Sequence, residues 1–281
     1  MSYKTILVHA DQSSHAPARM ALAARLALAC DAHLAALACT GISRYAQPGA
    51  PGHQGPLVPE TLDMWRAQAR ASLAAMEAIA ARAGLEPPAL SLLDADPEEA
   101  LMLRAPYCDL LVLSQTDPHE ASPGIIRDLP QNLLLHCGRP LLLAPYREGG
   151  PGTAAPFDHP LLAWDGSRHA ARAISDALPL LKMAGAVTLL VLNAEQRPAV
   201  HGMEPGADMA LLLARHGVRV EVVREYTTVE IGAALLCVAA ELGCDLLVMG
   251  GYGHRRARET LLGGATRTVL TEMTLPVLIA H

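Results

Sequence analysis

The sequence predicts an α/β protein built from two tandem copies of one domain, each an open parallel sheet with helices on both faces. Short apolar segments, typical of buried strands, alternate with longer segments rich in Ala and Leu that have helical composition. Two of the apolar segments recur later in the chain at a constant offset. The length of 281 residues is about twice that of a common single domain.

The repeat is clearest in the last two strands of each copy. Asp109–Leu113 reads DLLVL and recurs as DLLVM in Asp245–Met249, 136 positions later. Pro140–Ala144 reads PLLLA and recurs at the same offset as PVLIA in Pro276–Ala280. Because both pairs share one offset, we expect no insertion between these two strands in either copy.

Each copy also begins with an apolar strand that ends in an aspartate, Asp11 in the first copy and Asp165 in the second. Between the copies, segment 148–159 is rich in Pro and Gly and has no hydrophobic periodicity, as an interdomain linker would. We therefore expect a first domain over 1–147 and a second over 160–281.

The second copy contains five segments with strand composition, and four helices fit between them. These strands are expected at residues 160–164, 187–193, 218–224, 245–250 and 276–280. Two helix starts carry local signals. Thr227 and Glu230 have capping-box spacing, and Asp96 followed by Pro97 offers a cap and a first-turn proline.

Composition excludes several function classes. Half of the residues are hydrophobic and 18% are charged, which is a globular balance. The formal net charge of -6 argues against a protein that grips nucleic acid over a broad face. We find neither an apolar run long enough to span a membrane nor a signal peptide, so a cytoplasmic location is expected. The six cysteines form no C-x-x-C pair and are expected to be reduced thiols.

A glycine-rich loop follows the fourth strand of the second copy. It reads Gly250-Gly251-Tyr252-Gly253 and, after nine residues, Gly263-Gly264-Ala265-Thr266 at the start of a helix. Glycines let the backbone approach an anion, and the helix start favours phosphate. The alternative is that the glycines only permit a tight turn. The second glycine pair and the strand-ending Asp165 favour a nucleotide site.

These residues resemble the universal stress protein family, whose ATP-binding members carry G-x2-G-x9-G followed by Ser or Thr. Gly250, Gly253 and Gly263 match that frame. The resemblance covers nearly the whole chain, as a tandem two-domain member with the ATP-binding motif in the second domain only. It implies an adenine nucleotide alpha-hydrolase-like fold with five parallel strands in the order 3-2-1-4-5. It also implies ATP or a related adenine nucleotide, with or without Mg²⁺, as the ligand.

The resemblance also assigns the parts of the site. Ala163, Trp164 and Asp165 would flank the adenine, and Val191 would line it. The ribose and phosphates would follow Met249, Gly250, Gly253, Gly263, Gly264, Ala265 and Thr266. Arg255, in the basic run between the glycines, could clamp a polyphosphate. No catalytic residue and no metal site are assigned.

Two residues depart from the family pattern. Gly264 stands where a hydroxyl residue is usual, which removes a phosphate hydrogen bond that Thr266 could replace. Trp164 is large for a position beside adenine, and it could stack on the base or fill the pocket.

The first copy lacks the motif. The equivalent positions hold Ser114, Asp117, Arg127, Asp128 and Pro130. An aspartate there repels phosphate and a proline removes a backbone donor, so we expect no ATP in this copy. Asp11 is then a remnant of adenine recognition or, as we favour, a cap for the following helix.

We considered three functions. The resemblance favours a stress-response regulatory protein that binds an adenine nucleotide in its second domain and is not an enzyme. A structural dimerisation module without nucleotide is the alternative, and a slow ATPase is weaker because no Walker motif or nucleophile elbow is present. The expected partners are an unidentified protein and a second domain, which pairs through the last strands within the chain or in a homodimer. Nucleic acid and membrane are not expected.

Overall fold

The computed structural model describes residues 2–41, 59–120, 128–146, 157–196, 198, 203–252 and 264–281. The chain divides into two compact units, which we call the N-terminal unit, Tyr3–Arg139, and the C-terminal unit, built on Pro140–His281.

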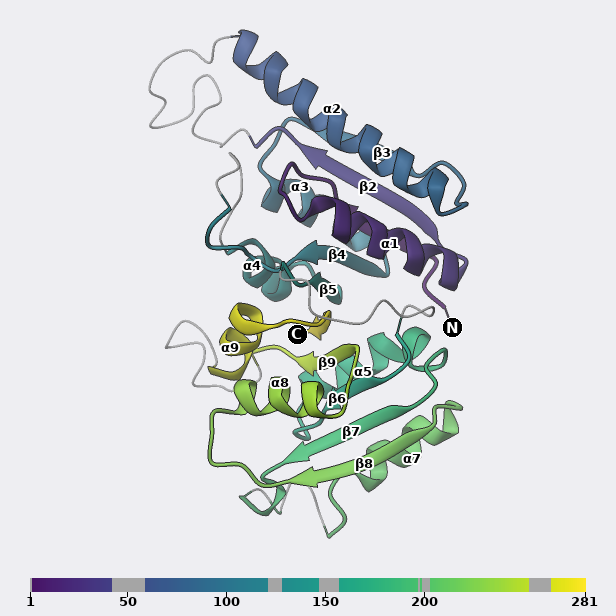
Figure 1. The fold of residues 1–281 in the computed structure, drawn as a ribbon, viewed down its shortest axis with the longest axis vertical. Coiled ribbons are helices and arrows are strands. Elements are labelled where there is room, and N and C mark those ends of the chain that lie inside the picture. The colour runs from purple at the N-terminus through teal and green to yellow at the C-terminus, as the bar shows by residue number, and fades with distance from the viewer. Residues whose placement is uncertain are drawn as a thin grey trace. The chain divides into compact units, whose positions relative to one another are not determined.

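The N-terminal unit has four parallel strands in the order β3-β2-β1-β4. Helices cover both faces of this sheet (Figure 1). The strands are β1 Thr5–His9, β2 His33–Cys39, β3 Ala89–Leu93 and β4 Leu110–Ser114. The helices are α1 Ala16–Cys30, α2 Pro59–Arg82, α3 Pro97–Arg104, the 3-10 turn η2 Ala105–Tyr107, and α4 Leu129–His136.

The C-terminal unit has the strand order β5-β10-β9-β6-β7-β8. Its strands are β5 Leu141–Ala144, β6 Pro160–Ala163, β7 Val187–Leu192, β8 Val220–Glu225, β9 Leu246–Gly250 and β10 Val277–Ala280. Its helices are α5 Arg168–Leu181, the 3-10 turn η3 Ala194–Gln196, α7 Ala207–Arg215, α8 Ile231–Glu241 and α9 Gly264–Glu272. Strands β6 to β10 are parallel and lie in the predicted order 3-2-1-4-5, which confirms the fold class.

Strand β5 is antiparallel to β10, with Leu143 opposite Val277 and Leu141 opposite Ile279. The repeat assigns β5 to the first copy, yet β5 clusters with the C-terminal unit because it extends that unit's sheet. The compact units therefore hold four and six strands instead of five each. The linker at 148–159 stays a prediction about the sequence repeats.

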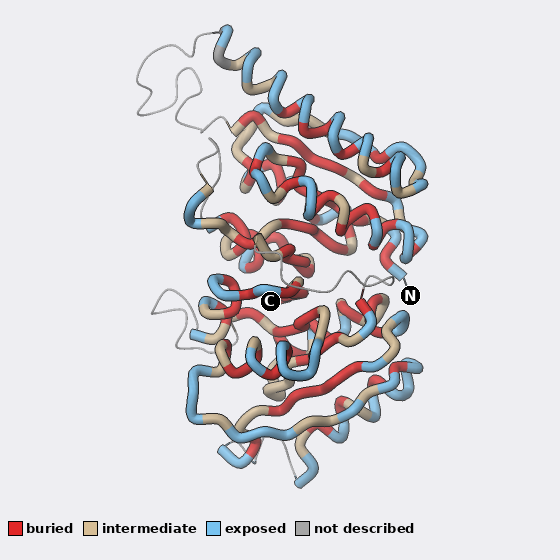
Figure 2. The backbone as a smooth tube through the Cα atoms, viewed as in Figure 1, coloured by how far each residue is buried: buried red, intermediate tan, exposed pale blue. Residues whose placement is uncertain are grey.

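The inner strands form the core of each unit, as the burial colouring shows (Figure 2). All four residues of 110–113 in β4 and of 246–249 in β9 are buried. Strands covered on both faces need apolar side chains at every position, which explains the continuous apolar runs in the sequence. Among the described residues, no helix combines the length and apolar character that a membrane span requires.

One of the two predicted helix starts is correct. Asp96 occupies the N-cap position of α3 and Pro97 begins the helix, although the Asp96 side chain makes no capping hydrogen bond. Helix α8 begins later than the capping-box spacing predicted. Its N-cap is Glu230, whose Oε2 accepts the N–H of Ala233 at 3.0 Å, while Thr227 holds the preceding turn.

Candidate functional site

A cavity of about 500 Å³ opens at the carboxyl ends of β6, β7 and β9 in the C-terminal unit. Its volume lies in the range of small-molecule sites. The chain order reverses between β6 and β9, and ligands of open α/β sheets bind at such switch points. The starts of α8 and α9 complete the wall.

Most of the predicted site residues meet at this cavity. Eight of them line it, namely Ala163, Trp164, Asp165, Met249, Gly250, Gly264, Ala265 and Thr266. Gly253, Arg255 and Gly263 lie outside the described residues. The cavity therefore gathers residues that the sequence predicted for one site, and both the site and its ligand stay predictions.

Val191 requires a correction because it is not among the lining residues. Its buried side chain points to the opposite face of β7, where its Cγ2 lies 3.1 Å from the position that a Cβ at Gly206 would occupy. Successive side chains of a strand point to opposite faces. Leu190 and Leu192 therefore line the cavity in place of Val191.

Trp164 and Asp165 follow β6 and form one wall. The Trp164 N–H donates to the carbonyl of Leu190 at 2.9 Å, which fixes the backbone at the cavity edge. The cavity keeps its volume with this indole in place, so Trp164 lines the pocket without filling it. Asp165 Oδ1 accepts the N–H of Ser167 at 2.9 Å and thereby orders the turn into α5.

The two described glycines at the predicted phosphate positions have different roles. A Cβ at Gly250 would lie 2.5 Å from the backbone N of Ala170 and 2.6 Å from the carbonyl carbon of His169. Glycine at this position therefore lets the end of β9 approach the start of α5. A Cβ at Gly264 would meet nothing closer than Glu230 Oε1 at 3.5 Å, which is ordinary van der Waals contact.

The predicted residue Thr266 and the unpredicted His281 fix the first residues of the glycine loop. The buried Thr266 hydroxyl accepts the N–H of Tyr252 at 3.2 Å, and Tyr252 has a left-handed φ of 53°. His281 Nδ1 lies 3.0 Å from the carbonyl of Gly251, and the His281 ring stacks on His169 at 4.4 Å. Burial, followed by the neighbouring His281, lowers the pKa of His169, which favours the neutral ring in this stack.

The wall contributed by α8 was not predicted from the sequence. Glu230, Ile231 and Leu235 of this helix line the cavity, and they approach it only because α8 and α9 pack closely. Among the described lining residues there is no Lys, Arg or His, and Asp165 and Glu230 supply two carboxyl groups. The described residues contain no group of three or more potential metal ligands.

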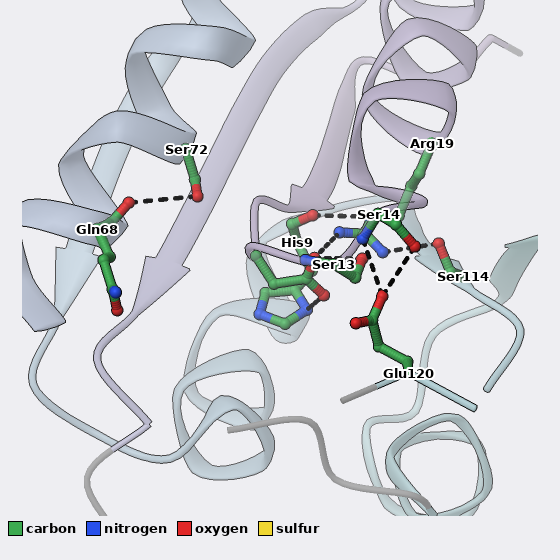
Figure 3. Close-up of polar contacts among 9 residues, drawn as sticks. His9, Ser13, Ser14, Arg19, Gln68, Ser72, Ser114 and Glu120 are labelled. Atoms are coloured by element: carbon green, nitrogen blue, oxygen red, sulfur yellow. Dashed lines mark hydrogen bonds and ion pairs between the residues drawn. The ribbon is translucent and has the colours of Figure 1, made fainter. Parts of the chain in front are cut away.

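The N-terminal unit has a much smaller cavity, about 50 Å³, at the ends of β1 and β4. The buried guanidinium of Arg19 lies against it and makes three hydrogen bonds (Figure 3). Its Nε donates to the carbonyl of His9 at 2.9 Å, Nη1 to Ser114 Oγ at 2.7 Å, and Nη2 to Asp11 Oδ1 at 2.8 Å. Ser114 occupies the position equivalent to Gly250.

The sequence favoured Asp11 as the cap of α1, but Asp11 does not cap this helix. The N-cap position is His15, and Asp11 Oδ1 instead accepts from Arg19 and from the backbone N–H and hydroxyl of Ser13. Burial raises the pKa of Asp11, but Arg19 and then His9 outweigh it and hold that pKa well below its usual value. Burial lowers the pKa of His9 to about 4.

The remaining residues of the first copy also differ from a phosphate loop. Pro130 lies in the first turn of α4, where it removes a backbone donor as predicted, and Asp128 is the N-cap of that helix. Asp117 Oδ2 pairs with His15 Nε2 at 2.9 Å. Arg127 lies outside the described residues.

Comparison with known proteins finds a family match in the C-terminal half. Residues 156–281 match the model of the universal stress protein family. A universal stress protein from Archaeoglobus fulgidus DSM 4304 aligns over 98% of this chain and 95% of its own, with a TM-score of 0.71 and 15% identity. A proposed universal stress protein from Pseudomonas aeruginosa UCBPP-PA14 aligns over 99% and 93%, with a TM-score of 0.58 and 17% identity. At these identities the alignments show a shared fold. No curated protein sequence matches the chain.

Proposed function

Because residues 156–281 form a domain of the universal stress protein family, we propose that the C-terminal unit binds ATP or a related adenine nucleotide as a stress-response regulatory protein. The observation that carries the proposal is the cavity of about 500 Å³ at the switch point of the sheet. It gathers eight residues that were predicted from the sequence for this ligand.

The cavity wall has the character that a nucleoside requires. Leu190, Leu192 and Ile231 supply apolar surface for a base, and Trp164 offers an aromatic face. Asp165 lies beside them and can accept hydrogen bonds from amino or ribose hydroxyl groups. The start of α9 also lines the cavity, and the backbone N–H groups of a helix start favour an anion.

A bulky substitution in the wall tests the proposal. Leu192→Trp places a large ring in the cavity, and we expect it to weaken ATP binding at least about tenfold in calorimetric titration. Leu212→Trp is the matched control, because Leu212 is 40% exposed on α7 and is not a lining residue. Native mass spectrometry of the full chain should show one nucleotide. Wild-type protein that binds no ATP at millimolar concentration would falsify the proposal.

We propose that the N-terminal unit binds no nucleotide. A space of about 50 Å³ is far below that of a ligand site, and the buried ion pair of Arg19 and Asp11 lies beside it. The proposed stoichiometry is therefore one nucleotide per chain, and a second calorimetric site would contradict it.

The alternative, a structural module that associates through its last strands, draws support from the pairing of β5 with β10. This pairing occurs within the chain, and β10 is hydrogen-bonded to β9 on its other side. Its edge is thus used by the chain itself, which favours a pseudo-dimer over a homodimer through β10. Pairing and nucleotide binding are compatible because the cavity lies at the carboxyl ends of other strands.

A further inference from the structure

Glu230 sets a carboxylate where a phosphate would be expected to bind. Its Oε1 lies 3.5 Å from the position that a Cβ at Gly264 would occupy, and Gly264 is the first residue of α9. The positive end of a helix dipole and its exposed N–H groups make this the place in the cavity that favours an anion.

The position of this carboxylate is fixed from both sides. Glu230 Oε2 accepts the backbone N–H of Ala233 at 3.0 Å and so caps α8. The two helices approach closely here, because a Cβ at Gly232 would lie only 2.6 Å from the carbonyl oxygen of Ala265. Close packing of α8 on α9 therefore keeps the side chain at the start of α9.

No described lining residue carries a positive charge that would offset Glu230. The apolar residues of β7 and α8 favour a base, whereas the carboxylates of Asp165 and Glu230 give the described wall a negative character. The Glu230 carboxylate would thus repel a phosphate at the helix start that otherwise attracts it.

We propose that Glu230 is a specificity-determining residue that selects adenine ligands by charge, penalising a metal-free polyphosphate relative to a nucleoside. The inference rests on the proposed adenine site and adds which members of that ligand class it accepts. Mg²⁺ bound to the phosphates reduces their charge and hence the penalty.

The test compares metal-free ATP with adenosine by calorimetric titration of the full chain at pH 7.5. Glu230→Gln keeps the side-chain carbonyl that can cap α8, and it should tighten metal-free ATP about tenfold while adenosine changes less than about twofold. The tenfold figure corresponds to one unit charge roughly 6 Å from a phosphate in a partly hydrated site. With excess Mg²⁺ the gain for ATP should shrink.

Two further variants keep the result interpretable. Glu230→Ser also removes the charge and supplies a preferred N-cap, so it should repeat the result if Gln disturbs α8. Glu221→Gln removes the same charge from an exposed position on β8 outside the cavity, and it should leave the affinity for both ligands unchanged.

The inference is overturned if both Glu230 variants stay folded by circular dichroism and leave the ratio of the ATP and adenosine dissociation constants unchanged. Failure of the adenine site itself looks different, because then neither adenosine nor ATP binds any of the proteins, wild type included.

Discussion

Gly250 has no side chain, and this lets β9 and α5 of the C-terminal unit pack closely. The contacts that a Cβ would make there are with backbone atoms of α5, which cannot rotate away. Glycine at this position of the motif thus serves packing, whatever ligand binds above it.

Gly250→Ala should lower the free energy of unfolding of the C-terminal unit by about 2 kcal/mol or more, because overpacking against backbone forces the elements apart. Gly264→Ala is the matched control and should change it by less than about 0.5 kcal/mol, since its added methyl group makes only ordinary van der Waals contact. Urea denaturation followed by circular dichroism measures both. Equal effects of the two variants would contradict the assignment of roles.

His9 makes the N-terminal unit sensitive to acid. Its pKa is about 4 in the folded protein and about 6.5 when unfolded, so between these values the unfolded chain binds more protons. The free energy of unfolding should therefore fall as pH drops from about 6.5 to 4, by roughly 3 kcal/mol in total. The lowered pKa of Asp11 also makes the folded protein less stable in acid, and it lowers the free energy of unfolding further at lower pH.

The pH effect is measured as denaturation midpoints across this range. His9→Gln should flatten the dependence, whereas His33→Gln, which removes an exposed histidine, should leave it as in the wild type. An identical slope in His9→Gln and wild type would rule out His9 as its source.

Single residues were the part of the site that sequence reasoning placed least well. Glycines and an aspartate at strand ends carry their own chemical signal, so residues predicted from them line the cavity. Val191 was predicted to line the ligand, but its side chain lies on the other face of β7. Because β7 is apolar on both faces, the sequence does not show which of its residues face the cavity. Glu230 was interpreted as part of a capping box, and only the packing of α8 on α9 places it beside Gly264.

At the scale of elements, the strands of the second copy were predicted to within two residues at each end. Continuous apolar runs between turn residues define buried parallel strands without tertiary information. The pairing partner of an outer strand cannot be predicted in this way, because the pairing of β5 with β10 joins residues more than a hundred positions apart. The sequence suggested this pairing only through its resemblance to a known family.

Removing β5 should make the second copy self-associate. A fragment of residues 156–281 retains β10 but lacks β5, and this exposes a row of unpaired N–H and C=O groups on a short apolar strand. We expect dimers in analytical ultracentrifugation at concentrations where the full chain does not associate through this edge. A fragment that remains monomeric at high concentration would count against β10 as an association edge.

For the whole molecule, the proposed function predicts unequal responses of the two units. A ligand that binds only the folded C-terminal unit stabilises it by about 2.7 kcal/mol at a concentration of 100 times the dissociation constant. Calorimetric scans with adenosine or Mg-ATP should therefore raise the melting temperature of one transition and leave the other in place. Leu192→Trp should abolish that shift, and an equal rise of both transitions would argue for a site in each unit.

The β5–β10 pairing also bears on how such a protein is supplied to the cell. If the two units were separate polypeptides, they would form both homodimers and heterodimers, in proportions set by their synthesis rates. A tether makes pairing intramolecular and therefore insensitive to dilution. Every polypeptide then carries one unit with a cavity of about 500 Å³ and one unit with a cavity of about 50 Å³, so the ratio of the two cavities is fixed at one to one.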